Sequence, residues 1–209
     1  AIELEPGLAK AHHNLGNLLV KSGESAAAER SFRAAIALDR GRAQSHAALA
    51  SLLQREGRFG EAVAAYREAV NQDERQLWVH NLAVCLCQQG QTEEAIRTFL
   101  RASELDPGSV ISHVAAAELC IAANVPGLTR APLARAAALD YADPGVAANI
   151  SRLMQTVALD EEAEAFTKRM LEAHPTDETL MLLLANVLQR GDRLEVGEPY
   201  YQRARELGA

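Results

Sequence analysis

Histidine and cysteine are the first side chains to consider as metal ligands, and cysteine is also a candidate nucleophile. Cys85 and Cys87 are two residues apart, and such neighbours on a helix point in different directions, so they do not form a zinc pair. His12, His46 and His113 are separated by 34 and 67 residues, a spacing that places them on different helices. Packed helices lie about 8–10 Å apart, too far for a shared ion held at about 2 Å per bond. We therefore predict packing roles for these residues, with no metal and no cofactor.

The sequence also lacks the motifs that organise common catalytic sites. It has no phosphate-binding loop, no dinucleotide-binding glycine motif, no nucleophile elbow and no His-x-Asp triad. Its acidic pairs, Glu93-Glu94 and Glu161-Glu162, fall where a solvated helix face is expected. We therefore predict that the chain is not an enzyme.

Composition limits the fold class and the kinds of partner. Of 209 residues, 40 are alanine, 13 are glycine and 7 are proline, which favours an all-α fold because alanine is the best helix former. A net charge of −7 and an aromatic content of 4% argue against nucleic acid as a partner. No apolar run approaches the ~20 residues that span a bilayer, so no membrane partner is expected. Three cysteines suit a reducing compartment, which predicts a cytoplasmic protein, and the start at Ala1 suggests a piece of a longer chain.

A repeat of about 34 residues organises the whole chain. A large apolar residue followed by a small one recurs at steps of 34, 33, 34, 34 and 34 residues, beginning at Leu15-Gly16. In a numbering that places Leu15 at position 7 of its unit, small residues also recur at positions 20 and 27, and a large residue recurs at position 24. The predicted units are residues 9–42, 43–75, 76–109, 110–143, 144–177 and 178–209, after a stub at 1–8 that ends a preceding unit.

Each unit has the pattern of two amphipathic helices joined by a tight turn. Apolar residues at 3–4 spacing fill positions 1–14, and Gly23, Gly57 and Gly90 stand at position 15, where the turn requires a left-handed residue. The fourth unit departs from the pattern because Asn124 replaces the glycine, and Pro126 and Pro132 interrupt the second helix. In the sixth unit the turn glycine is assigned to Gly191, one place early, and Pro199 lies near the start of the second helix.

This combination of positions resembles the tetratricopeptide repeat (TPR) family. The resemblance implies an all-α, right-handed superhelix (α-solenoid) of antiparallel helix pairs, with the first helices lining a concave groove. The segment 11–17, which contains Asn14 and Asn17, is similar to the repeats of O-linked GlcNAc transferases, whose asparagine ladder holds extended polypeptide. Because such arrays need polar caps and none is visible here, we also predict a homo-oligomer formed through the uncapped ends.

The family's groove positions, 2, 5, 6, 9, 12 and 13, supply the candidate site. They carry five basic residues and one acid, Glu118, on a chain that is acidic overall. The asparagines at position 6 could pair with a peptide backbone, because an amide both donates and accepts hydrogen bonds. In the alternative interpretation, the basic residues merely end the first helices and the asparagines are ordinary solvated groups. The candidate peptide-binding residues are Lys10, His13, Asn14, Asn17, Lys21, Arg55, His80, Asn81, Asn149, Arg152, Asn186 and Arg190.

Two functions are consistent with this pattern. The first is a non-catalytic protein-interaction scaffold that binds an extended peptide or a partner surface in the groove, with an acidic or neutral ligand favoured by the basic residues. The alternative is the substrate-recruiting arm of a larger glycosyltransferase, sulfotransferase or hydroxylase whose catalytic domain lies outside this sequence.

Overall fold

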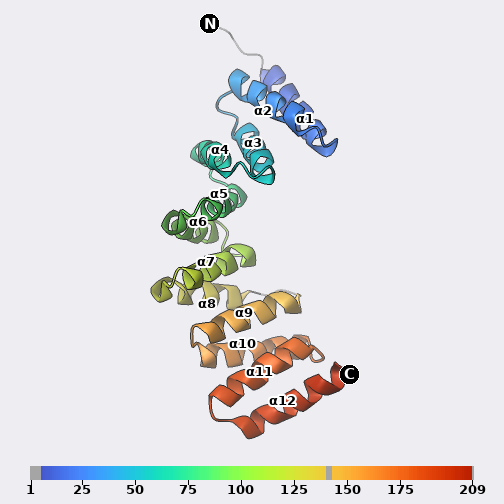
Figure 1. Cartoon of the computed structure of the whole chain (residues 1–209), viewed down its shortest axis with the longest axis vertical. Coiled ribbons are helices and arrows are strands. Elements are labelled where there is room, and N and C mark those ends of the chain that lie inside the picture. The colour runs from blue at the N-terminus through green and yellow to red at the C-terminus, as the bar shows by residue number, and fades with distance from the viewer. Residues whose placement is uncertain (1–5, 140–142, 209) are drawn as a thin grey trace. The chain divides into compact units, whose positions relative to one another are not determined.

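The computed structural model describes residues 6–139 and 143–208, and all regular structure in those two ranges is helical (Figure 1). The chain divides into two compact units, Ala1–Asp106 and Pro107–Ala209. The helices of the first unit are α1 (Pro6–Lys21), α2 (Ser25–Leu38), α3 (Ala43–Arg55), α4 (Phe59–Gln72), α5 (Gln76–Gln88) and α6 (Thr92–Leu105). Those of the second unit are α7 (Val110–Ala122), the 3-10 turn η1 (Pro126–Leu128), α8 (Arg130–Ala138), α9 (Pro144–Thr156), α10 (Asp160–Ala173), α11 (Glu178–Arg190) and α12 (Leu194–Leu207).

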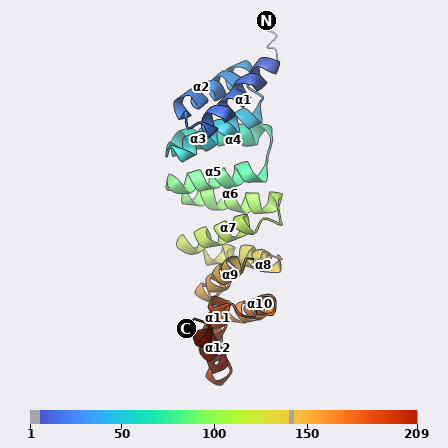
Figure 2. The same ribbon diagram turned by 90° about the vertical axis from the view of Figure 1, so that its right-hand side faces the viewer.

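Packing inside each unit is sequential. Each helix contacts the next one along the chain, and neighbouring odd-numbered helices also touch, α1 with α3 and α3 with α5, then α7 with α9 and α9 with α11 (Figure 2). The odd-numbered helices are the first helices of the predicted repeats. They therefore form one face of each unit, and the prediction of an all-α, solenoid-like repeat is confirmed.

The small repeat positions lie where the helices are in closest contact. Ala83 at position 8 and Ala95 at position 20 are both fully buried, and so is Ala102 at position 27. A larger side chain would hold the two helices apart, while the large residue at position 24, such as Tyr66, fills the space beside them and is 1% exposed. The packing role predicted for these positions is confirmed.

The turn after each first helix contains one residue with a left-handed backbone. The three predicted glycines have φ of 79°, 75° and 72°, at Gly23, Gly57 and Gly90. The second unit uses Asn124, Ala158 and Asp192 instead, with φ of 54°, 57° and 56°. The assignment of Gly191 as the sixth turn residue was wrong, because its φ is −85° and Asp192 at position 15 takes the left-handed conformation.

The proline-rich fourth repeat has a delayed second helix. Pro126 opens the 3-10 turn η1, and α8 begins only at Arg130, so that Pro132 falls in its first turn, where its missing N–H costs no helical hydrogen bond. The helix has nine residues, whereas α4 and α10 have fourteen each. In the sixth repeat α12 continues through Pro199.

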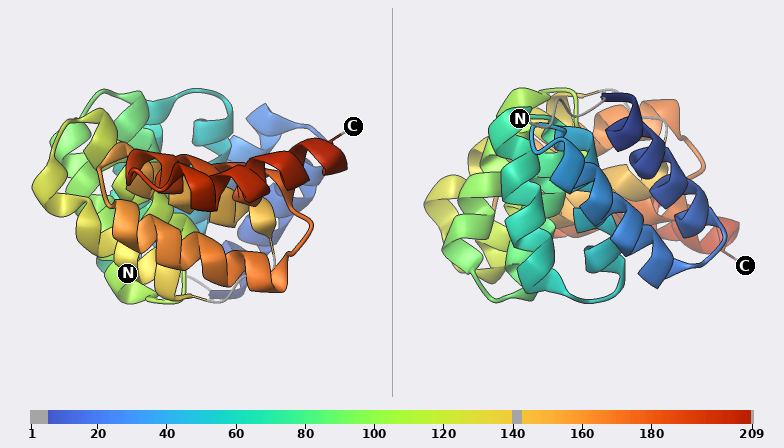
Figure 3. Two further views of the ribbon diagram at one scale, coloured as in Figure 1. Left: turned by 90° about the horizontal axis from the view of Figure 1, so that it is seen from below. Right: turned by 90° about the horizontal axis from the view of Figure 1, so that it is seen from above.

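Among the described residues, helix α1 exposes apolar side chains. Leu15, at position 7, is 46% exposed, whereas its counterparts Leu49 and Leu82 are 8% and 7% exposed because α2 and α4 pack against α3 and α5. The right panel of Figure 3 shows α1 beside α2, and the left panel shows α12. Helix α12 likewise exposes Leu194 and Leu207. The predicted association through the ends remains a prediction.

Candidate functional site

A pocket of about 320 Å³ opens in the first unit on the face formed by α1, α3 and α5. It is lined by His13, Gln44, Ala47, Ala48, Ser51, Tyr66, Leu77, Trp78 and Asn81. Two of the predicted peptide-binding residues, His13 and Asn81, therefore share one depression. The lining contains no lysine, arginine or carboxylate, so the pocket offers hydroxyl, amide and imidazole groups beside apolar surface.

Tyr66 reaches this pocket from α4, behind the first helices. Its hydroxyl donates to Gln54 Oε1 at 3.0 Å and also interacts with Ser51 and Asn81. Burial raises the pKa of Tyr66 to about 12, so the phenol stays protonated and remains a donor at neutral pH.

His13 is held in one orientation at the pocket edge. The amide of Asn17 donates to its Nε2 at 3.1 Å, which places the proton of the neutral ring on Nδ1, 3.2 Å from Ser45 Oγ. Burial, and secondarily the charge of Arg42, lowers the pKa of His13 below its ordinary value. The imidazole is therefore neutral near pH 7, and Asn17 is occupied in positioning it.

Sequence reasoning missed the aromatic part of the pocket. Trp78 is the chain's only tryptophan and lies beside Leu77, which is 60% exposed. The guanidinium of Arg75 lies 5.0 Å from the centre of the Trp78 ring. Trp78 falls at position 3 and Tyr66 at position 24, neither of which is a groove position of the family. The available signal was that a single tryptophan occurs next to an apolar residue at a groove position.

The other candidates of the first unit do not line the pocket. Lys10, Lys21 and Arg55 are exposed and do not line the pocket, and no ion pair involves them within residues 6–139 and 143–208. His80 packs edge-on against Phe99 with ring centres 5.1 Å apart, and burial lowers its pKa. Asn14, also exposed, does not reach the pocket lining.

The candidates of the second unit mostly serve contacts within that unit. The side-chain amide of Asn149 donates to Glu118 Oε1 at 2.8 Å, so this amide is paired with the one acid of the predicted groove. Asn186 accepts from the Tyr201 hydroxyl at 2.5 Å. Arg190 donates to the carbonyl oxygen of Gln155 at 3.0 Å and to Asp160 at 3.1 Å. Arg152, the fourth candidate there, is exposed.

Two histidines at position 4, His46 and His113, form hydrogen bonds to the loops that precede their helices. His46 Nε2 lies 3.1 Å from the carbonyl oxygen of Arg40, and His113 Nε2 lies 3.0 Å from that of Pro107, in each case six residues earlier.

Burial raises the thiol pKa of Cys85 to about 11 and raises that of Cys120, so both are poor nucleophiles. In the described part of the chain, no three His, Cys, Asp or Glu side chains cluster as metal ligands would. Nor is any helix of that part both long and apolar enough to cross a bilayer.

Comparison with known families agrees with the helix pairs and their spacing. Two family models, each described as tetratricopeptide repeat, match residues 13–77 and 53–124. This chain belongs to the tetratricopeptide repeat family. Neither matching model describes a catalytic domain, and TPR membership supports a protein-interaction scaffold with protein partners.

Solved structures show the same fold. The C-terminal part of a TPR repeat-containing protein from Cytophaga hutchinsonii matches with a TM-score of 0.74 and 15% identity, covering 93% of this TPR chain and 78% of that one. The pilF protein of Pseudomonas aeruginosa matches with a TM-score of 0.63 and 22% identity, covering 96% and 92%. YrrB, described as a TPR protein with an unusual peptide-binding site, matches with a TM-score of 0.62 and 16% identity, covering 81% and 88%. No curated protein sequence gives a significant match.

Proposed function

We propose that this TPR protein is a non-catalytic scaffold whose first unit binds an extended, neutral or acidic peptide across α1, α3 and α5. The observation that carries the proposal is the pocket on that face, where Asn81, Ser51 and His13 lie beside the exposed Leu77 and the half-buried Trp78. The peptide-binding site named for YrrB, a protein of the same fold, adds support.

The pocket contains the two kinds of contact that an extended peptide requires. The Asn81 amide lines the pocket and can pair with a main-chain N–H or C=O whatever the peptide sequence. Trp78 and Leu77 give one apolar side chain of the ligand a surface to cover. Because hydrogen bonds already hold His13 and Tyr66 at the pocket, binding requires little reordering of these two side chains.

Charge selection would come from the surroundings of the pocket. Lys21 and Arg55 lie in the last turns of α1 and α3, and Lys10 is exposed on α1. Each exposed charge contact contributes only about 0.2–1 kcal/mol and weakens in salt. We therefore expect the basic residues to accelerate the approach of acidic peptides, while the amide and aromatic contacts determine how tightly they are held.

Intrinsic fluorescence tests the proposal directly, because Trp78 is the only tryptophan and lines the pocket. Hits from a peptide array should change the Trp78 emission in a saturable titration. Asn81→Ala should weaken binding about fivefold at both low and high salt, since one hydrogen bond nets about 0.5–1.5 kcal/mol. The matched control is Asn149→Ala, the same change in the second unit, which should leave binding unaltered.

The salt dependence separates the charges from the pocket. The double variant Lys21→Gln with Arg55→Gln should lose affinity mainly at low ionic strength, where the Debye length is long. Circular dichroism confirms that each variant keeps its helices. Preferential binding of basic peptides, or an Asn81→Ala protein that binds as well as the parent, would show that this face is not the peptide site.

A further inference from the structure

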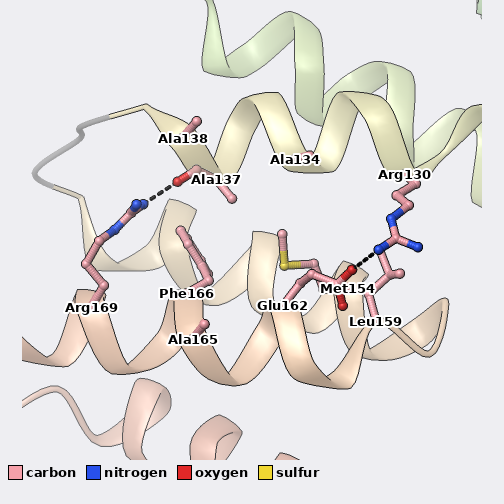
Figure 4. A pocket seen from close by; sticks show the side chains of 10 residues that line it. All are labelled: Arg130, Ala134, Ala137, Ala138, Met154, Leu159, Glu162, Ala165, Phe166 and Arg169. Carbon is pink, nitrogen blue, oxygen red and sulfur yellow. Dashed lines mark hydrogen bonds and ion pairs between the residues drawn. The ribbon is translucent and has the colours of Figure 1, made fainter.

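A second pocket, of about 480 Å³, lies in the other compact unit (Figure 4). It is bounded by α8 and α10, the second helices of the fourth and fifth repeats, and by Met154 of α9. It is thus built on the second helices, whereas the peptide pocket proposed above is built on first helices of the first unit. Neither the family positions nor the proposed function accounts for it.

Alanines on α8 create this pocket. Ala134, Ala137 and Ala138 occupy repeat positions 25, 28 and 29, and all three line the pocket. No other second helix has alanine at all three positions. The corresponding residues are Arg67, Val70 and Asn71 in α4, and Lys168, Leu171 and Glu172 in α10. The space that larger side chains would occupy is therefore left open in the fourth repeat.

The facing helix α10 turns an aromatic ring towards that space. The first three repeats carry their aromatic residue at position 24, but the fifth carries Phe166 at position 23 and Thr167 at position 24. Thr167 is buried and its hydroxyl lies 2.7 Å from that of Ser151, which replaces the usual small apolar residue at position 8. Phe166 and Met154 consequently point into the gap below α8 (Figure 4).

The two ends of the pocket carry different charges. At one end Arg130 is paired with Glu162, so its charge is compensated. At the other end Arg169 donates to the carbonyl oxygen of Ala137, and its guanidinium lies 5.5 Å from the centre of the Phe166 ring. Arg169 forms no ion pair with any carboxylate in the described residues. The lining therefore carries one positive charge in excess, next to an apolar cavity.

We propose that this pocket binds a small organic acid with an apolar alkyl or aryl body, its carboxylate pairing with Arg169. The volume falls within the ~300–1,000 Å³ of small-molecule sites, which are mostly apolar with a few polar groups that fix orientation. Met154, Phe166 and the α8 alanines accept the apolar body. Arginine is suited to the acid because its planar fork can donate two hydrogen bonds to one carboxylate.

Methyl-labelled methionine provides the readout on the intact protein. The sequence has three methionines, and of these Met154 lines the pocket while Met170 and Met181 do not. We expect 4-phenylbutyrate to shift the Met154 methyl resonance saturably, with a Kd on the order of 1 mM for so small a ligand. The uncharged analogue 4-phenylbutan-1-ol should bind about fivefold more weakly, since a partly exposed charge pair contributes up to about that factor.

Two kinds of variant separate the cavity from the charge. Ala134→Leu should abolish the Met154 response by filling the space, while Ala131→Leu, an exposed site on the same helix outside the lining, should preserve it. If Ala134→Leu does not fold, Ala165→Leu fills the pocket from α10 instead. Arg169→Gln removes the positive charge while keeping a polar side chain, and it should erase the preference for the acid over the alcohol.

Each of three results would overturn the proposal. The first is an unshifted Met154 resonance in the parent protein, or an equal shift of Met170 and Met181, which would mean non-specific contact. The second is an undiminished response in the filled variants, which would place the ligand elsewhere. The third is equal binding of the acid and the alcohol by the parent, which would remove the role of Arg169.

Discussion

The left-handed turn residue of the fifth repeat offers a direct test of the repeat geometry. Ala158 has a φ of 57°, a conformation in which a side chain costs about 1–2 kcal/mol, whereas Gly57 occupies the same position in the second repeat. Changing Ala158→Gly removes that strain but adds chain freedom in the unfolded state, at a cost of about 0.5–1 kcal/mol. We expect a net gain of about 0.5–1 kcal/mol. Because Ala158 is exposed, the lost methyl group sacrifices no buried surface.

The reverse exchange should have the opposite sign. A Cβ built on Gly57 meets no atom within 4 Å, so Gly57→Ala imposes only the backbone strain and should destabilise by about the same amount. Asn124→Gly should gain less than Ala158→Gly, because asparagine tolerates the left-handed region better than alanine does. Ala64→Gly, at an exposed site in the middle of α4, is the control that should lose about 0.5–1 kcal/mol.

Urea and thermal unfolding followed by circular dichroism measure these differences. A gain of this size corresponds to a rise in Tm of about 1–4 °C for a chain of this length. The reasoning fails if Ala158→Gly lowers Tm as Ala64→Gly does, because the φ of residue 158 would then not be left-handed in solution. It also fails if Gly57→Ala is neutral.

Two further predictions concern packing and charge. Gly16→Ala should destabilise the protein by about 1 kcal/mol in urea unfolding, although alanine has the better helix propensity, because the new Cβ would lie 2.5 Å from the buried Phe32 ring. The control is Gly60→Ala, whose Cβ meets only a glutamine side chain and should not destabilise the protein. The pKa of Glu164 is lowered to about 2, chiefly by its hydrogen bond from Arg193, so this carboxylate stabilises the fold above pH 4.5 and that contribution disappears as the pH falls towards 2. Because solvent screens the half-exposed Arg193, we expect Glu164→Gln to lower the free energy of unfolding in urea by only about 1 kcal/mol at pH 7, and not to lower it near pH 2. An equal loss of stability at both pH values would contradict the lowered pKa of Glu164.

The fold could be predicted wherever the repeat positions hold. The small residues Ala83 and Ala95 and the turn glycine Gly90 each have one structural role, and periodicity alone identified that role. The sixth turn failed because glycine permits a left-handed backbone without requiring it. Counting from the start of α11 places the turn at Asp192, so the position within the repeat, and not the residue type, determines which residue takes the left-handed conformation.

The candidate site was less predictable because the groove positions do not indicate which side chains form hydrogen bonds or ion pairs with one another. Glu118 and Asn149 belong to adjacent repeats, and their hydrogen bond became visible only when the helices were placed side by side. One pairing did have a sequence signal that was overlooked. Arg58 contacts Glu29 and Arg193 contacts Glu164, and both pairs join position 16 of one repeat to position 21 of the repeat before it. Comparing the charged residues at positions 16 and 21 of successive repeats would have predicted both ion pairs.

Departures from the repeat pattern also explain where this chain acquires features of its own. In a solenoid each repeat contacts only its neighbours, so a change at one interface does not propagate through the others. The fifth repeat could therefore lose its aromatic residue at position 24, because both buried hydroxyls are satisfied: Thr167 donates to the carbonyl oxygen of Ala163 and accepts from Ser151. With the aromatic residue at position 23 instead, the ring of Phe166 lines the pocket next to α8. The pocket thus follows from two local substitutions, alanine on α8 and a one-residue shift of an aromatic ring on α10, without any change in the helix pairs that hold the unit together.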